Sequence, residues 1–354
     1  MLTGTVAGCG PAETQPAIPD APLVDVQEDT SIPAPEPSPE PASEQTPEPE
    51  PEPEPTGNSL SIIGTIFPQY DWTRQILGER SGHMDLILLQ DTRVDLHNFQ
   101  PSVRDMVTIS SCDLFIYVGG DSDFWVEDVL RQAANPDMIV INLLELLGDA
   151  ALLEDELDHD DHHHHHHHHT GDDDELEFDE HVWLSLKNAV IFCSAIADAL
   201  SVLDPEFSTV YSANLTSYID ELNDLDAEYA TILDGLPNRI LLFGDRFPFR
   251  YLIEDYGLEY YAAFSGCSAE TEASFQTIVF LARRMDEHNL RNIMVTESSD
   301  QSIARTVIDS SSAGDQNILV LDSMQSVTAD DVQSGVTYIS IMQNNLQVLK
   351  NALA

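Results

Sequence analysis

Two histidines in this sequence have neighbours that suit metal binding. His97 lies in VDLHNFQPS (residues 94–102), and His181 lies in DEHVWLS (residues 179–185). Neutral imidazoles combined with carboxylates suit zinc, manganese or iron, and a larger share of imidazole favours zinc. A lone histidine is more often a surface or core residue, so the prediction depends on both histidines lying at the same edge of the fold.

Two aspartates follow apolar triplets that we expect to end strands. Asp245 comes shortly after LLF (residues 241–243), and Asp322 comes directly after LVL (residues 319–321). Ligands of open α/β sheets bind at the carboxyl ends of the strands. We therefore predict one metal ion held by His97, His181 and Asp322, with Asp245, another carboxylate or water in the fourth position.

Arg246 departs from this chemistry, because arginine stays protonated and cannot ligate a cation. It could instead clamp Asp245 or Asp322 in a bidentate ion pair and so orient that carboxylate. The alternative is that Arg246 replaces the charge of the ion, which would leave a site that no longer binds metal. Three residues are weaker candidates for the same site. Glu297 could approach the metal, although a helix N-cap explains its segment as well, and Cys267 could be a soft ligand. Glu270 could support a ligand, with a solvated loop as the alternative.

An acidic, histidine-rich segment interrupts the chain between residues 154 and 180. Its histidines are His159, His162, His163, His164, His165, His166, His167, His168 and His169. Adjacent histidines flanked by aspartates cannot pack a core, yet neutral imidazoles can hold several ions by exchanging partners. We predict a mobile, low-affinity metal collector that is distinct from the tight site.

The rest of the chain from residue 59 alternates predicted strands and helices. Apolar runs predict strands at 61–65, 84–89, 113–118, 138–143, 239–243, 259–264, 292–296 and 318–321. Helices are predicted at 70–77, after Pro101, and at 184–203, 207–236, 249–256, 274–287, 302–310 and 331–353. Alternation of this kind indicates βαβ units and mostly parallel sheets. The predicted fold is α/β, with two such lobes joined by the long helix over 207–236.

These patterns divide the chain into five parts. They are a signal-peptide remnant with a lipobox (1–9), a disordered Pro/Glu-rich tether (10–58), an N-terminal α/β lobe (59–185) that includes the acidic loop 154–180, a helical segment with the long linker helix (186–237), and a C-terminal α/β lobe (238–354).

The first residues and the charge predict where the protein works. Val6-Ala7-Gly8-Cys9 is typical of a lipobox, with Cys9 as the lipidated residue, although the charged start of a signal peptide is missing and is expected upstream. Alternating Pro and Glu favour an extended spacer between anchor and folded lobes.

The net charge of −49 excludes nucleic acid as a partner and suits a protein that attracts cations. We expect a lipid-anchored protein on the extracytoplasmic face of a bacterial membrane.

The remaining cysteines limit the number of disulfides, and the hydropathy bears on whether the chain has a membrane-spanning helix. With Cys9 lipidated, three thiols remain, so at most one internal disulfide can form among Cys112, Cys193 and Cys267. No run of 18 or more apolar residues occurs, so no membrane-spanning helix is expected in the mature chain.

Together these segments resemble the metal-specific substrate-binding proteins of ABC importers, the zinc and manganese receptors. DLHNFQPS (95–102) is similar to the family's DPHxxxPS/T loop, and DEHVWLS (179–185) to its DPHxWLS element. Weaker matches occur at 117–126, 255–258, 269–274 and 321–323, so that the resemblance covers roughly residues 60–353. The chain departs from the family where Leu96 and Glu180 replace proline and where Arg246 replaces a His or Glu ligand.

The resemblance implies that His97, His181 and Asp322 are metal ligands and that the histidine-rich insertion marks the zinc branch. It also implies a monomeric receptor, not an enzyme, whose lobes are linked by a rigid helix and close only slightly on the metal. Such a receptor delivers zinc, or alternatively manganese, to an ABC importer permease. The alternatives are an adhesin or extracellular metal buffer, and a zinc hydrolase, which the lack of HExxH or of a nucleophile elbow disfavours.

Overall fold

The computed structural model describes residues 59–91, 96–154, 177–266 and 272–354. The chain divides into two units, Met1–Thr56 and Gly57–Ala354, and every described residue belongs to the second. The predicted anchor at Cys9, the tether, the histidine run, Cys267 and Glu270 lie outside the described residues.

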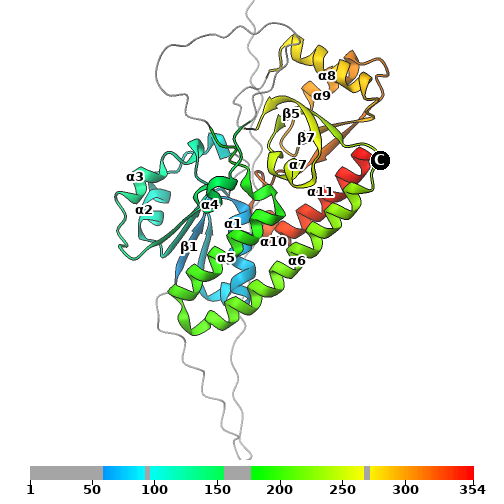
Figure 1. Ribbon diagram of the computed structural model, residues 1–354. Coiled ribbons are helices and arrows are strands. Elements are labelled where there is room, and N and C mark those ends of the chain that lie inside the picture. The colour runs from blue at the N-terminus through cyan, green and yellow to red at the C-terminus, as the bar shows by residue number, and fades with distance from the viewer. Residues whose placement is uncertain (1–58, 92–95, 155–176, 267–271) are drawn as a thin grey trace, which may run out of the picture. The chain divides into compact units, whose positions relative to one another are not determined.

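Two four-stranded parallel sheets share one strand order (Figure 1). The N-terminal lobe has the order β2-β1-β3-β4, with β1 Ser61–Gly64, β2 Asp85–Leu88, β3 Leu114–Tyr117 and β4 Ile139–Asn142. The C-terminal lobe has the order β6-β5-β7-β8, with β5 Ile240–Phe247, β6 Glu259–Ser265, β7 Asn292–Thr296 and β8 Asn317–Leu321. The predicted α/β fold with two parallel-sheet lobes is confirmed.

Helices cover both faces of each sheet, as parallel sheets require. They are α1 Phe67–Leu77, α2 Val103–Ser111, α3 Val126–Leu130, α4 Leu143–Leu147, α5 Leu186–Leu203, α6 Ser208–Asp234, α7 Arg250–Tyr256, α8 Phe275–Glu287, α9 Ser302–Ser310, α10 Ala329–Gln333 and α11 Tyr338–Leu353. Neighbouring strand residues therefore enter different cores. Ile62 packs in the core that contains α1 and α5, whereas Ile63 packs in the core that contains α2 and α3.

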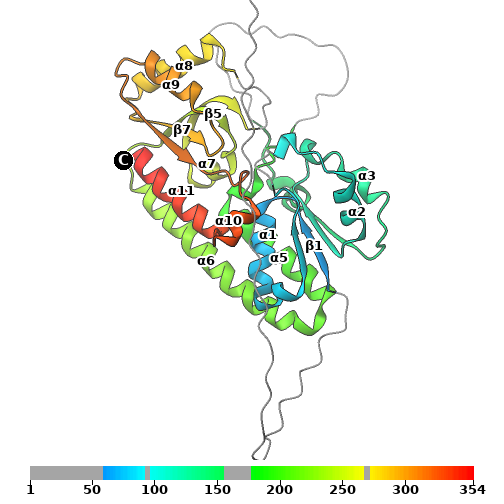
Figure 2. The same ribbon diagram turned by 180° about the vertical axis from the view of Figure 1, so that it is seen from behind.

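The long helix α6 has 27 residues, or about 40 Å of helix. It packs against α1 and α5 of the N-terminal lobe and against α7 and α11 near the C-terminal sheet (Figures 1 and 2). One continuous apolar core runs along it, and that core includes residues of both sheets. The predicted long helix between the lobes is present.

Helix α5 is the one described helix long and apolar enough to cross a membrane by length and composition. Its buried side chains include Phe192, Cys193 and Ile196 in the shared core, and it packs against α6 and α1. These contacts account for its apolar sequence, because a helix buried between other helices needs an apolar face.

Helix α2 begins after Pro101, as predicted, with Ser102 as its N-cap, which accepts from Asp105 N–H. Other predicted boundaries were wrong. The first helix starts at Phe67, three residues earlier than predicted, since the Gln69 side chain accepts from the Thr65 and Ile66 N–H groups. The predicted helix 331–353 is two helices, α10 and α11.

The break between α10 and α11 has a local cause. Gly335 has φ 96, a left-handed conformation that favours glycine, and Thr337 then starts α11 as its N-cap. The short helices α3 and α4, of five residues each, have no predicted counterpart, because five residues are too few to show a helical period.

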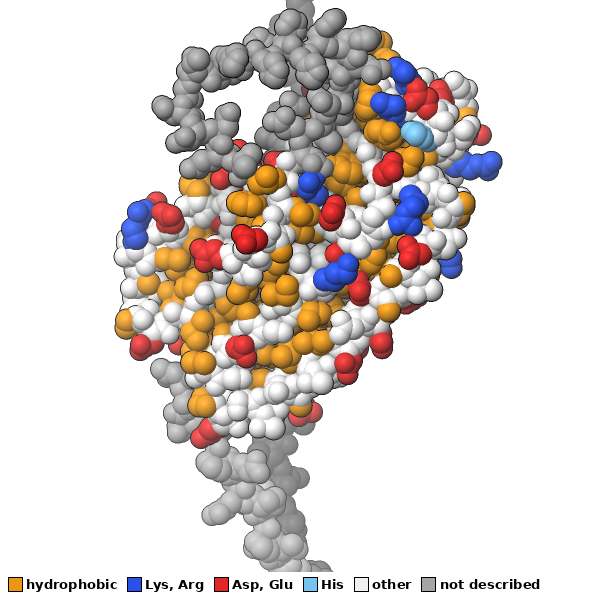
Figure 3. All heavy atoms as spheres, in the orientation of Figure 1, with side chains coloured by type: hydrophobic (Ala, Val, Ile, Leu, Met, Phe, Trp, Pro, Cys, Tyr) orange, Lys and Arg blue, Asp and Glu red, His pale blue; other side chains and the backbone are white. Residues whose placement is uncertain are grey.

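Cys112 and Cys193 are free and buried. Burial raises the pKa of the Cys112 thiol to about 12, so this side chain is an unreactive core residue. On the face drawn in Figure 3, Asp and Glu side chains are spread over both lobes, whereas most Lys and Arg side chains lie toward the C-terminal lobe.

Candidate metal centre

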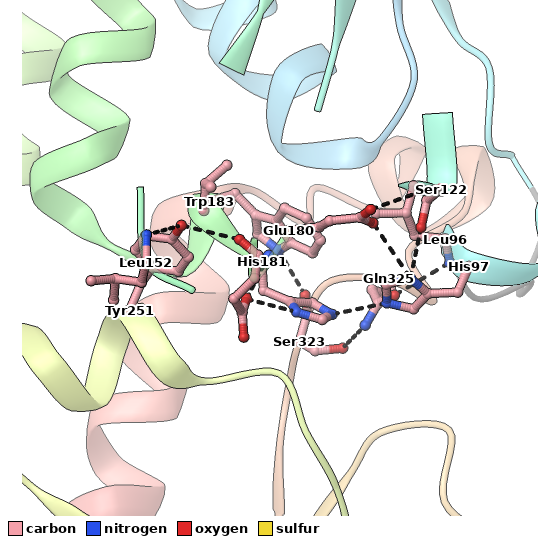
Figure 4. Close-up of polar contacts among 12 residues, drawn as sticks. Leu96, His97, Ser122, Leu152, Glu180, His181, Trp183, Tyr251, Ser323 and Gln325 are labelled. Atoms are coloured by element: carbon pink, nitrogen blue, oxygen red, sulfur yellow. Dashed lines mark hydrogen bonds and ion pairs between the residues drawn. The ribbon is translucent and has the colours of Figure 1, made fainter. Parts of the chain in front are cut away.

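His97 and His181 come together in the N-terminal lobe (Figure 4). Their Nε2 atoms are 3.4 Å apart, and their rings meet at an angle of 64°. Two nitrogens that each lie 2.0–2.1 Å from a tetrahedral zinc are about 3.4 Å apart. The spacing of the two Nε2 atoms therefore fits one shared zinc ion.

The Nδ1 atom of His97 faces a half-buried hydroxyl and a buried carboxylate. It lies 2.7 Å from Ser122 Oγ and 3.4 Å from Glu180 Oε2. The other Glu180 oxygen accepts from Ser122 N–H at 2.9 Å. Burial raises the pKa of Glu180, and Gly120, at φ 81, leaves the space that this carboxylate fills.

The Nδ1 atom of His181 faces Asp179. One Asp179 oxygen lies 3.0 Å from Nδ1 and accepts from His181 N–H at 2.9 Å. The Tyr251 hydroxyl on α7 donates to the Asp179 carbonyl at 3.0 Å and accepts from Leu152 N–H at 3.0 Å. A side chain from the C-terminal lobe thus fixes the backbone that carries this carboxylate.

These partners set the chemistry of the pair. When Nδ1–H donates to an oxygen, the free lone pair is on Nε2, and the imidazole becomes a better metal ligand. The Asp179 carboxylate assigns this tautomer to His181, whose Nε2 lone pair then faces the His97 ring. A cation between the two Nε2 atoms would be coordinated by His181 and, with the same tautomer, by His97.

The C-terminal lobe approaches this pair closely at Gly266. A Cβ atom at this position would lie 3.0 Å from His181 Cε1 and 2.8 Å from the Phe247 carbonyl oxygen. Glycine is therefore required where the turn after β6 meets the His181 ring.

Asp322 lies at the end of β8, in a cavity of about 560 Å³ that Glu297 and Asp331 also line. Burial, with a further contribution from the charge of Glu297, raises the pKa of Asp322 to about 7. One of its oxygens accepts from Met324 N–H at 2.8 Å.

Asp245 and Arg246 line a different cavity, of about 260 Å³, near the start of α9. One Asp245 oxygen accepts from Thr296 N–H (3.2 Å) and from its hydroxyl (2.9 Å), and the other accepts from Arg246 N–H at 2.9 Å. Across the four described ranges, no group of three or more His, Cys, Asp or Glu side chains is placed to hold a metal ion. The structure thus brings together two of the predicted ligands, and the roles of Asp322 and Asp245 stay predictions.

Sequence reasoning missed the residues that support the histidines. Asp179 and Glu180 directly precede His181, and this adjacency was a usable signal that they hold imidazole nitrogens. Ser122, Tyr251 and Asn345 carry no such signal, because each reaches the site from another element of the fold.

The fold and the histidine pair define a two-lobed α/β protein with two imidazole nitrogens at the spacing that one zinc ion requires. Residues 62–352 match the family described as ZnuA, zinc-uptake complex component A, periplasmic. The chain belongs to this family.

Two curated relatives show how far the similarity extends. The zinc-binding lipoprotein AdcA of Streptococcus pneumoniae (strain R6) is 31% identical over 295 residues, which is 82% of this chain and 55% of AdcA. The high-affinity zinc uptake system protein ZnuA of Bacillus subtilis (strain 168) is 29% identical over 297 residues, with 84% and 88% covered. The chain thus spans about half the length of AdcA and most of the Bacillus protein.

Two solved structures are similar to this chain over most of its length. The Zn(II)-bound ZnuA-like domain of S. pneumoniae AdcA is 28% identical, with a TM-score of 0.64 over 84% of this chain and 99% of that domain. The metal-dependent lipoprotein YcdH of B. subtilis is 25% identical, with a TM-score of 0.66 over 84% of this chain and all of the other.

Proposed function

We propose that this protein is the extracytoplasmic receptor of an ABC importer, and that it captures zinc and delivers it to the permease. The observation that carries the proposal is the pair of Nε2 atoms 3.4 Å apart, each on a ring whose Nδ1 faces an oxygen. The named relatives are zinc-binding or zinc-uptake proteins, which supports zinc over manganese.

The test is an equilibrium zinc titration of protein purified without a metal-affinity column, with elemental analysis of the same sample. We expect one tight zinc site, and zinc uptake that fails in cells lacking the gene. A chain that binds no metal tightly, or cells that take up zinc normally without it, would contradict the proposal.

We propose that Asp322 supplies the third ligand, and Asp245 or water the fourth. Asp322 is the better candidate of the two aspartates because, among the described residues, only one of its carboxylate oxygens accepts a hydrogen bond, from Met324 N–H. Both Asp245 oxygens already accept hydrogen bonds, so Asp245 would have to exchange partners to bind a metal.

We also propose that the protein is not an enzyme. A zinc hydrolase needs a general base beside the metal ligands. The carboxylates nearest the histidines, Asp179 and Glu180, instead face imidazole Nδ1 atoms. Mixed hydrolase substrates should therefore show no zinc-dependent turnover, and turnover that requires His97 and His181 would overturn this.

We propose that a diacylglycerol on Cys9 anchors the chain to the membrane, as the lipobox predicts. Labelled palmitate should enter the wild-type chain and not Cys9→Ala. A Cys9→Ala protein that still fractionates with membranes would show that the anchor lies elsewhere.

A further inference from the structure

The loop of residues 322–325, directly after β8, is fixed in an unusual backbone conformation. Asn345 on α11 accepts from Asp322 N–H at 2.9 Å and donates to the Asp322 carbonyl at 2.8 Å. Met324 is buried and has φ 66, in the left-handed region. Such a conformation is unfavourable for a residue other than glycine, so the surrounding contacts must hold it.

One carboxylate provides most of the remaining support. Glu297 follows β7, and its Oε2 atom accepts from Ser323 N–H at 2.8 Å. Its Oε1 atom accepts from the Ser323 hydroxyl at 2.9 Å and from Gln325 N–H at 3.2 Å. Hydrogen bonds to a charged acceptor are roughly twice as strong as neutral ones. Both Glu297 oxygens are thus committed to this loop.

The same loop contacts the segments of both histidines (Figure 4). The Ser323 carbonyl accepts from Trp183 Nε1 at 2.9 Å, and Trp183 lies two residues after His181. The Gln325 side chain accepts from Leu96 N–H at 3.3 Å, directly before His97, and donates to the Ser323 hydroxyl at 3.3 Å. Ser323 therefore joins Glu297, the His181 segment and, through Gln325, the His97 segment.

We propose that Glu297 is a positioning residue for metal capture: by fixing residues 322–325 it holds the His97 and His181 segments at their spacing and orients Asp322. Glu297 acts through the loop and does not touch the ion. This inference rests on the proposed zinc-binding function and assigns Glu297 a role that differs from that of a ligand.

Glu297→Gln tests the proposal in the full-length chain. Glutamine has the same shape, but its amide nitrogen cannot accept, so at least one loop donor would face another donor. We expect zinc affinity, measured against a competing chelator, to fall about 10–100-fold, as for other partners outside the coordination sphere. The visible absorption of one bound equivalent of Co²⁺ should also weaken, because the two Nε2 atoms no longer hold a tetrahedral spacing. Unchanged affinity and an unchanged spectrum would overturn the proposal.

Asp286→Asn is the matched control. Asp286 accepts from Ser312 N–H at 3.0 Å and from the Ser312 hydroxyl at 2.7 Å, the same type of contact that Glu297 makes to Ser323. Ser312 precedes β8, whereas Ser323 follows it, so the control lies at the other end of the strand. We expect Asp286→Asn to lower thermal stability without changing zinc affinity or the Co²⁺ spectrum. If both variants change stability alone, Glu297 has only a structural role.

A double-mutant cycle separates positioning from ligation. If Glu297 acts through the loop, Glu297→Gln should lower affinity less in Asp322→Asn than in the parent, because the part of its effect that orients Asp322 is already lost. Independent ligation by Glu297 would make the two losses add, and that result would also overturn the proposal. If the proposed zinc-binding function itself is wrong, the result is different. The parent chain would then already lack a tight zinc site, as would His97→Ala.

Discussion

The two lobes share a strand order but differ in how their polar residues are used. In the N-terminal lobe, His97 and His181 point Nε2 at each other while Asp179, Glu180 and Ser122 face their other ring nitrogens. In the C-terminal lobe, Asp245 and Glu297 are occupied by hydrogen bonds within their own lobe. The N-terminal lobe thus presents two imidazoles at the spacing of one zinc ion, and we propose that a carboxylate of the C-terminal lobe completes the site.

Replacing either histidine should have the largest effect on binding. His97→Ala and His181→Ala each remove one of the two prepared ligands, so zinc affinity should fall by well over the 10–100-fold expected for a supporting residue. Chelator competition measures this. Two single variants that both keep the parent affinity would remove the histidine pair from the account.

Asp322→Asn should have the next largest effect, and Asp245→Asn a smaller one. The pKa of Asp322 is raised to about 7, so the apo protein holds a proton there that zinc must displace. Affinity should therefore rise with pH up to about 7, and part of this rise should vanish in Asp322→Asn. If Asp245→Asn loses more affinity than Asp322→Asn, the third ligand has been assigned to the wrong aspartate.

Asp179→Asn should weaken zinc binding by about 10–100-fold, because it removes the charged partner of His181 Nδ1 but leaves the imidazole in place. Ser122→Ala tests the same effect at His97 and should be milder, since a hydroxyl is a neutral partner. Equal losses for Asp179→Asn and His181→Ala would mean that the carboxylate is itself a ligand.

Asp71→Asn should leave zinc binding unchanged and affect stability alone. Asp71 is buried on α1 and accepts from Tyr338 N–H at the start of α11 at 2.8 Å. Burial raises its pKa, so the folded chain holds a proton that the unfolded chain releases above about pH 3.9. The free energy of unfolding of the parent should then fall as pH rises through this window.

In Asp71→Asn this fall should be smaller, since asparagine does not titrate. Denaturant melts at several pH values measure the difference. A parent and variant with parallel pH profiles would show that Asp71 keeps its ordinary pKa in the fold.

Deleting residues 159–170 should lower the number of zinc ions bound while leaving the tight site intact. The proposed ligands His97, His181 and Asp322 all lie outside that segment of the sequence. Loss of the tight site on deletion would instead make the histidine-rich segment part of it.

Much of the fold and part of the site could be predicted from the sequence. Apolar runs such as Leu114–Tyr117 locate buried strands, because a strand covered on both faces must be apolar throughout. His97 and His181 are predicted to lie close together, because both lie in loops at the edge of the fold formed by the carboxyl ends of the strands. The αL turn at Met324 was not predictable, since its loop is held by Glu297 and Asn345, which lie on other elements. The break at Gly335 has a local cause, and the glycine was an overlooked signal for a helix end.

The residues that support the histidines and Asp322 were also hard to predict from the sequence. Tyr251 reaches Asp179 across 72 residues of sequence, and Asn345 reaches Asp322 across 23. Their roles follow from tertiary packing, which local patterns do not encode. Asp179, the partner of His181, and Glu180, which faces His97, are exceptions, because both directly precede His181 in the chain.

X-ray absorption at the zinc edge tests the central claim most directly. The sample is the chain without residues 159–170, loaded with one equivalent of zinc, so that the histidine run contributes no ligands. We predict two imidazole nitrogens at about 2.0–2.1 Å, with oxygen in the remaining positions, and one imidazole in His97→Ala. A spectrum without imidazole, or one that is identical in His97→Ala and His181→Ala and the parent, would contradict the account.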